Sequence, residues 1–273
     1  MSGPSLPHSL IGPLSHPPLP PSLPPPAPST RPEDSHAAGG GGGGGFGGAS
    51  AAAAPHQAHR WSPYELNGGT ALGIAGDDFA VVAADTRLSE GYGILSRSVS
   101  KARQLTPRCV VATGGCWTDV ATLHKVLGKT CDAYRNAHES EVPTPGIAQM
   151  LGNTLYGRRF FPYYAFNVVA GIDGEGRGAV YTYDAVGSFE RVAYAAQGAG
   201  QKLIIPLLDN LVGGKNRGGP GAVPRLTKEA AAELCKDAFI TAGERDIYTG
   251  DAVEVFTITK DGVRMERFAL KKD

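Results

Sequence analysis

Short apolar runs dominate the first half of the sequence that follows about residue 61, and they predict strands. The first two runs flank the cluster Gly76-Asp77-Asp78, which is typical of a tight turn. The fourth run is closed by Gly114-Gly115. We expect strands at residues 70–75, 79–85, 91–95 and 109–113.

The hydrophobic period then changes to three and four residues, which predicts helices. Thr118 can cap the first helix, and Thr144-Pro145 can open a second, because proline at the first helical position loses no hydrogen bond. The apolar positions of the first helix are Val120, Leu123, Val126 and Leu127. Two helices in succession follow the first group of strands.

The same alternation is repeated in the second half of the chain. Asp173-Gly174-Glu175-Gly176 and Lys260-Asp261-Gly262 are turn sequences that predict two hairpins. The expected strands are 164–172, 178–184, 189–195, 253–259 and 263–270, and the expected helices are 201–211 and one that starts at Thr227. Because helices come in pairs between groups of strands, the pattern predicts an α+β fold with two antiparallel sheets between helix pairs, a four-layer αββα sandwich.

Composition divides the 273 residues into two parts. Residues 1–59 are rich in Pro, Gly and Ala, so they have little apolar surface to bury, and we expect a disordered extension or a propeptide. Residues 60–273 have the composition of one globular domain. The net charge of zero gives no reason to expect nucleic acid, and no apolar run is long enough to cross a membrane.

The sequence offers little material for a metal or cofactor site. The four cysteines contain no CxxC pair, so we expect reduced, buried thiols and no metal. His124 and His138 are the two histidines of the domain, and both are expected on helix faces. The run from Gly198 to Lys202 lacks the full spacing of a phosphate loop, so we expect no nucleotide or other cofactor.

Several motifs of the domain resemble those of the 20S proteasome beta subunits, which are N-terminal nucleophile hydrolases. They are Gly69-Thr70, Ala84-Asp85-Thr86-Arg87, the segment around Lys101, Ala112-Thr113-Gly114-Gly115 and the run from Glu244 to Asp251. The resemblance implies the four-layer sandwich and a place in stacked heptameric rings with other beta and alpha subunits. It also implies that polypeptide substrates pass through a shared chamber, and that the protein is located in the cytoplasm and nucleus.

Active members of this family use a threonine exposed as the first residue of the mature chain. Its α-amine takes the hydroxyl proton, a lysine held by an aspartate favours the deprotonated hydroxyl, and glycine N–H groups form the oxyanion hole. By the motifs, the aspartate corresponds to Asp85, the lysine to Lys101 and the oxyanion glycine to Gly114-Gly115. The second aspartate corresponds to Asp246, and Thr249 and Ala199 stand where the family has serines.

The nucleophile position is where this sequence departs from the active pattern. In active members the threonine lies one position further from the aspartate than Thr70 lies from Asp85 (85 − 70 = 15). We expect that Thr70 takes a later, non-nucleophilic place, that Gly68 stands at the nucleophile position, and that the turn after the first strand is one residue longer. The amino-acid sequence of the domain also resembles that of a non-catalytic subtype of the family.

The interpretation favoured here is therefore a structural subunit in which the former site is an ionic network. In it Lys101 is expected between Asp85 and Asp246, and Arg87 and Arg245 are expected in ion pairs or interfaces. Two alternatives remain. Thr70 could be a working nucleophile released by cleavage after Gly69, or the Pro-rich tail could make the chain a binding module for aromatic-lined grooves.

Overall fold

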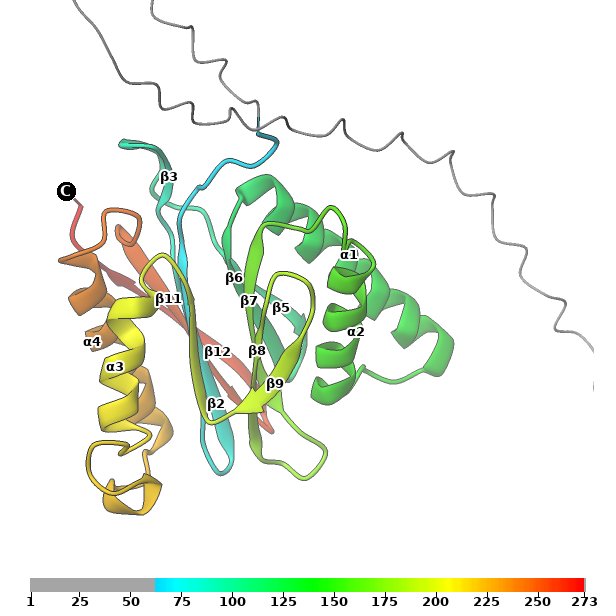
Figure 1. Ribbon diagram of the computed structural model, residues 1–273. Coiled ribbons are helices and arrows are strands. Elements are labelled where there is room, and N and C mark those ends of the chain that lie inside the picture. The colour runs from blue at the N-terminus through cyan, green and yellow to red at the C-terminus, as the bar shows by residue number, and fades with distance from the viewer. Residues whose placement is uncertain (1–61, 273) are drawn as a thin grey trace, which may run out of the picture. The chain divides into compact units, whose positions relative to one another are not determined.

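Twelve strands form three antiparallel sheets in residues 62–272, the part of the chain that the computed structural model describes (Figure 1). The expected extension, residues 1–59, lies outside this range. The first five-stranded sheet has the order β10-β1-β2-β11-β12 and contains β10 Tyr194–Gly198, β1 Thr70–Ala75, β2 Phe79–Asp85, β11 Ala252–Thr259 and β12 Gly262–Ala269. The second has the order β5-β6-β7-β8-β9 and contains β5 Ala102–Thr106, β6 Cys109–Gly115, β7 Ala165–Ile172, β8 Gly178–Tyr183 and β9 Phe189–Val192. A small two-stranded sheet pairs β3 Leu88–Glu90 with β4 Gly93–Ser96.

Helices follow the strands in two pairs. The first pair is α1 Trp117–His138 and α2 Thr144–Tyr156, and the second is α3 Gln201–Leu211 and α4 Lys228–Gly243, with a short 3-10 turn at Pro220–Ala222 between α3 and α4. Thr227, the predicted start of α4, is its N-cap, and its hydroxyl accepts a hydrogen bond from the Ala230 N–H. The described part of the chain is thus a mixed fold of sheets and helices.

The two large sheets bury apolar side chains on both faces. In β2, Val82 and Ala84 belong to a core cluster with Val110 and Val168 of the second sheet. Their neighbour Val81 points to the other face, because successive side chains of a strand alternate.

Each helix pair covers one outer face. Val81 packs with Leu208 of α3 and Phe239 of α4, whereas α1 and α2 pack on the second sheet through residues such as Leu123 and Leu151. Figure 1 shows one helix pair on each side of the strands. The strands that carry the candidate site are therefore enclosed between helices.

Two predicted strands, one missed strand and one predicted helix cap differ from the structure. Residues 189–195 form two strands, because β9 pairs with β8 in the second sheet and β10 pairs with β1 in the first. Residues 91–95 do not form one strand, since the chain turns at Gly91 and Tyr92 between β3 and β4. Strand β5 was not predicted. Cys116, and not Thr118, is at the N-cap position of α1, and its side chain makes no capping hydrogen bond.

All four cysteines of the chain lie in this part, and they are buried and free, as predicted. Within residues 62–272, no helix combines the length and the apolar character needed to span a bilayer.

Candidate functional site

Asp85 is the centre of the candidate site, and it lies where β2 leaves the core. Its carboxylate is fully buried and accepts hydrogen bonds from the Thr70 N–H at 2.9 Å and from Lys101 Nζ at 3.2 Å. Longer hydrogen bonds come from the backbone N–H groups of Arg87 and Gly250, at 3.3 and 3.4 Å. The expected partnership of Asp85 and Lys101 is therefore present.

Lys101 immediately precedes β5 and is only 2% exposed. Besides the Asp85 carboxylate, its ammonium group donates to the backbone carbonyls of Asp85 and Arg87. Burial raises the pKa of Asp85 and lowers the pKa of Lys101, and the attraction between the two charges opposes both shifts. All three donor positions of the ammonium group thus have an acceptor.

The two glycines before β1 point in different directions. A Cβ atom placed on Gly69 would lie 2.6 Å from Cδ and 2.7 Å from Cε of Lys101, whereas one placed on Gly68 would lie 2.7 Å from Cβ of Tyr248. Both glycines have positive φ angles, 74° at Gly68 and 90° at Gly69, which L side chains rarely adopt. The position that faces the lysine is therefore Gly69, one residue later than the expected Gly68.

Thr70 faces away from the lysine because side chains alternate along a strand. Its hydroxyl accepts from the Gly200 N–H at 2.8 Å and lies 2.7 Å from the Thr249 hydroxyl, which in turn donates to the Asp246 carboxylate. Since Thr249 gives its proton to Asp246, Thr70 must donate to Thr249. The Thr70 hydroxyl is thus 0% exposed and fixed as a donor within a satisfied chain of hydrogen bonds.

The prediction that Asp246 pairs with a buried cation was wrong. Asp246 is half-buried and has no ion pair among residues 62–272; it accepts hydrogen bonds from the Thr249 hydroxyl and from the Tyr248 N–H at 3.1 Å. The residue instead serves the chain that holds Thr70 in place. Arg245, expected in an ion pair or an interface, is exposed and likewise forms no ion pair within that range.

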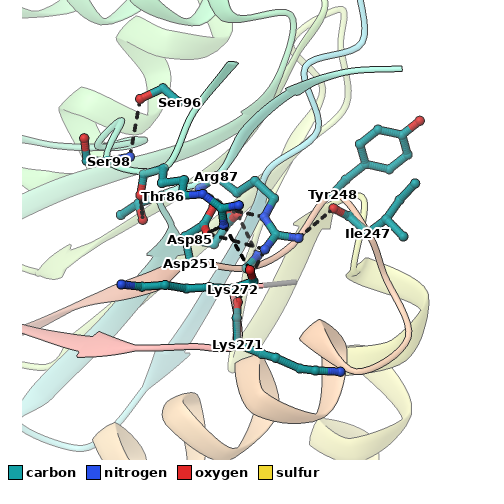
Figure 2. A network of polar contacts seen from close by, with 12 residues as sticks. Asp85, Thr86, Arg87, Ser96, Ser98, Ile247, Tyr248, Asp251, Lys271 and Lys272 are labelled. Atoms are coloured by element: carbon teal, nitrogen blue, oxygen red, sulfur yellow. Dashed lines mark hydrogen bonds and ion pairs between the residues drawn. The ribbon is translucent and has the colours of Figure 1, made fainter. Parts of the chain in front are cut away.

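Asp251 is the second buried acid of the region, and sequence reasoning did not assign it a role. Figure 2 shows its carboxylate beside Arg87, whose Nε lies 3.0 Å from Asp251 Oδ2. Arg97 also pairs with it. Although burial acts to raise the pKa of Asp251, the hydrogen bonds and charges of the two arginines lower it on balance.

Arg87 uses the rest of its guanidinium group on backbone carbonyls. Its Nη atoms donate to Ile247 at 3.0 Å and to Lys271 at 3.3 Å, so this side chain ties the C-terminal segment to β2 (Figure 2). The ion-pair role predicted for Arg87 is confirmed. Asp251 lies within the sequence run that was recognised, but nothing in its spacing distinguishes an ion-pair partner from a turn residue.

Gly115, in the expected oxyanion pair Gly114-Gly115, and Ala199, at an expected serine position, both donate their backbone N–H groups to the chain itself. The Gly115 N–H donates to the Gly68 carbonyl at 2.9 Å, and the Ala199 N–H donates to the Gly69 carbonyl at 3.0 Å. The methyl group of Ala199 offers no hydroxyl. Within residues 62–272, no three His, Cys, Asp or Glu side chains gather as metal ligands would.

The arrangement therefore contains a buried lysine–aspartate pair whose lysine faces Gly69, a residue without a side chain. A buried ion pair of this kind can stabilise the junction of two sheets.

A family model described as proteasome subunit matches residues 65–258. The chain is similar to proteasome subunit beta type-1 of Arabidopsis thaliana, with 48% identity over 223 residues that cover 80% of this chain and 99% of the relative. It is 49% identical over 215 residues to proteasome subunit beta type-1-B of Carassius auratus, covering 79% of this chain and 90% of the relative. Proteasome subunit beta type-6 of Saccharomyces cerevisiae is 41% identical over 223 residues, which are 79% of this chain and 92% of the relative.

Proposed function

Because the chain belongs to the proteasome subunit family, we propose that it is a structural, non-catalytic beta subunit of the 20S proteasome core particle. Its role is to support the degradation of ubiquitin-tagged proteins by sibling subunits that carry active nucleophiles. Relatives that carry the name beta type-1 and align over almost their whole length support this role. The cores on both faces of each large sheet support the four-layer αββα arrangement.

The observation that carries the proposal is Gly69 opposite Lys101. We infer that Gly69, and not Gly68, occupies the former nucleophile position, since only a side chain at Gly69 would meet the lysine. The sequence separation agrees with this assignment, because Gly69 lies sixteen positions before Asp85 (85 − 69 = 16), the spacing expected of an active member. The turn between β1 and β2 then needs no additional residue.

The alternative that Thr70 is the nucleophile has little support in this geometry. Its nitrogen is a peptide N–H bonded to Asp85, and its hydroxyl is buried and oriented towards Thr249. Cleavage after Gly69 would free this nitrogen as an amine, but the hydroxyl would still have to turn away from Thr249 before it could attack a substrate. The third possibility, a binding module based on the Pro-rich tail, rests on residues outside the described range.

We further propose that the subunit occupies stacked heptameric rings with other beta and alpha subunits, in the cytoplasm and nucleus. Polypeptide substrates would pass through the chamber that it helps to enclose. The family membership supports assembly with other proteasome subunits, and the ring positions follow from the resemblance.

The test is to replace the wild-type chain in the assembled particle by Thr70→Ala. We expect every peptidase activity of the particle to stay within about twofold of wild type, as with the exposed control Thr130→Ala. Intact-mass measurement should show a mature chain that begins upstream of Gly69. Loss of one cleavage activity with normal assembly, or a chain that begins at Thr70, would contradict the proposal.

A further inference from the structure

The segment that follows β12, residues 270–272, is hydrogen-bonded to Asp251, the residue just before β11. The Leu270 N–H donates to the Asp251 carbonyl at 3.0 Å, and the Asp251 N–H donates to the Lys271 carbonyl at 3.2 Å. Asp251 has a positive φ angle of 68°, which is unfavourable for a residue with a Cβ atom. The segment therefore fixes both backbone groups of Asp251 in a conformation that this residue rarely adopts on its own.

Two arginine side chains connect the segment to the Asp251 carboxylate. Arg87 donates to the Lys271 carbonyl at 3.3 Å. Arg97 donates to the Lys272 carbonyl at 3.4 Å. Both arginines also pair with the carboxylate, as Figure 2 shows for Arg87. The Arg87 side chain is 3% exposed and the Arg97 side chain is 47% exposed, so one buried and one open arginine bind the segment.

The backbone of Arg87 makes hydrogen bonds with both members of the buried ion pair. Its N–H donates to the Asp85 carboxylate at 3.3 Å, and its carbonyl accepts from the Lys101 ammonium group. The guanidinium group lies against Gly250, where an added Cβ atom would be 2.5 Å from Cζ of Arg87. The Gly250 N–H in turn donates to Asp85 at 3.4 Å. The residue that binds the segment 270–272 is thus the residue that contacts both charges of the pair.

Loss of the segment would act on the ion pair through Asp251 and Arg87. Without the Lys271 carbonyl, the Asp251 N–H has lost its acceptor and Arg87 has lost one of its acceptors. Asp251 can then leave its positive φ angle, which moves its carboxylate away from Arg87. Burial lowers the pKa of Lys101, and the charges of Asp85 and, to a smaller degree, Asp251 oppose this lowering. A displaced Asp251 carboxylate therefore also withdraws a charge that favours the ammonium form.

We propose that residues 270–272 are a latch on the buried Asp85–Lys101 pair, and that Arg87 couples the latch to the pair. While the latch is bound, Arg87 and Asp251 are held in position and the pair stays closed to water. The side chains of residues 271 and 272 are exposed, so the state of a surface segment reaches two charges in the core. The proposal concerns the pair as a structural unit, and it holds whether or not the chain is catalytic.

The test is residue-resolved hydrogen–deuterium exchange on the complete chain, in the assembly in which it is purified, compared with a chain that ends at Leu270. The Thr70 and Gly250 amides report on the pair, because both donate to Asp85. The Val169 amide, in the middle of the second sheet, reports on general unfolding. Relative to Val169, the other two amides should exchange at least about tenfold faster in the shortened chain, the factor expected when one hydrogen bond to a charged group is lost.

A chain that ends at Lys271 is the matched control. It keeps the carbonyl that Arg87 and Asp251 share and loses only the Lys272 carbonyl, an acceptor of the exposed Arg97. Its exchange at the two reporting amides should stay within about threefold of wild type. In the chain that ends at Leu270, equal acceleration at all three amides would indicate general destabilisation, and no acceleration would indicate no coupling; either result overturns the proposal.

If the chain that ends at Leu270 is not recovered in folded form, the wild type decides the question. The Leu270 and Asp251 amides close the latch, so they should exchange no more than about tenfold faster than the Gly250 amide. A larger difference would show that the latch opens while the pair stays closed, which contradicts the proposed coupling.

Discussion

A double-mutant cycle on Asp85 and Lys101 should separate the two halves of the buried ion pair. Asp85→Ala removes the acceptor of four donors and leaves the Lys101 ammonium group with two backbone carbonyls only. Breaking a buried pair by removing one partner costs about 3–5 kcal/mol. We expect Asp85→Ala at the upper end of this range, because backbone N–H groups of Thr70, Arg87 and Gly250 are also left without an acceptor.

Lys101→Met should cost less, about 3 kcal/mol, because Asp85 then keeps its three backbone donors. The carbonyls that lose the ammonium group tolerate the loss better than a charge would. The double variant should be less destabilised than the sum of the two single variants by about 1–3 kcal/mol, the coupling typical of contacting residues.

The measurement is the free energy of unfolding from urea titration of the three variants and the wild type, at one pH near 7. Exposed Lys125→Met is the control for replacing a lysine by methionine, and it should change the free energy by less than about 0.5 kcal/mol. Additivity of the two single effects within about 0.5 kcal/mol would refute the ion-pair interpretation of the site.

Three further predictions concern residues around the site and the core. Burial lowers the pKa of His124 from 6.5 to about 4, so between these values the unfolded chain binds more protons, and stability should fall by about 3 kcal/mol as pH falls from 6.5 to 4. In His124→Gln, thermal unfolding across this range should lack that part of the pH dependence, and an unchanged slope would show that another group is responsible. Asp246→Ala should lower the free energy of unfolding by about 1–3 kcal/mol, less than Asp85→Ala, because hydrogen bonds but no ion pair are lost; equal costs in urea titration would contradict this. Arg87→Met should cost about 3–5 kcal/mol and Arg97→Met less than about 1, since the Arg97 side chain is 47% exposed, and the reverse order in the same assay would refute this assignment.

The hydrophobic pattern predicted most of the fold because local signals mark most of the elements. The bounds of α3 at 201–211 and the start of α4 at Thr227 were both predicted, since periodicity and helix-start signals are local properties. The division of residues 189–195 between two sheets was not predicted, because the run contains no Gly or Pro to mark a break and its sheet partners lie elsewhere in the chain.

The site shows the same division. The partnership of Asp85 and Lys101 was predicted from recognised motifs, and the pairing of Arg87 with an acid was expected. The sequence did not predict which of the two glycines faces Lys101. Gly68 and Gly69 are adjacent, and only the backbone angles decide which one faces the lysine. The buried Asn67 side chain, which donates to the Ser89 carbonyl and accepts from the Trp117 N–H, was also missed, since a single Asn before Gly-Gly is typical of a turn.

The strand order of the first sheet has a consequence for the synthesis of the chain. The hairpin of β1 and β2 is made early, but its neighbours in the sheet are β10 on one side and β11 on the other. Both edges of the hairpin therefore stay unpaired while the ribosome adds more than a hundred further residues, at about 5–20 residues per second. Unpaired strand edges are templates for aggregation, and such long-range pairing folds slowly. A nascent chain arrested before residue 194 should therefore depend on chaperones far more than one released after residue 259.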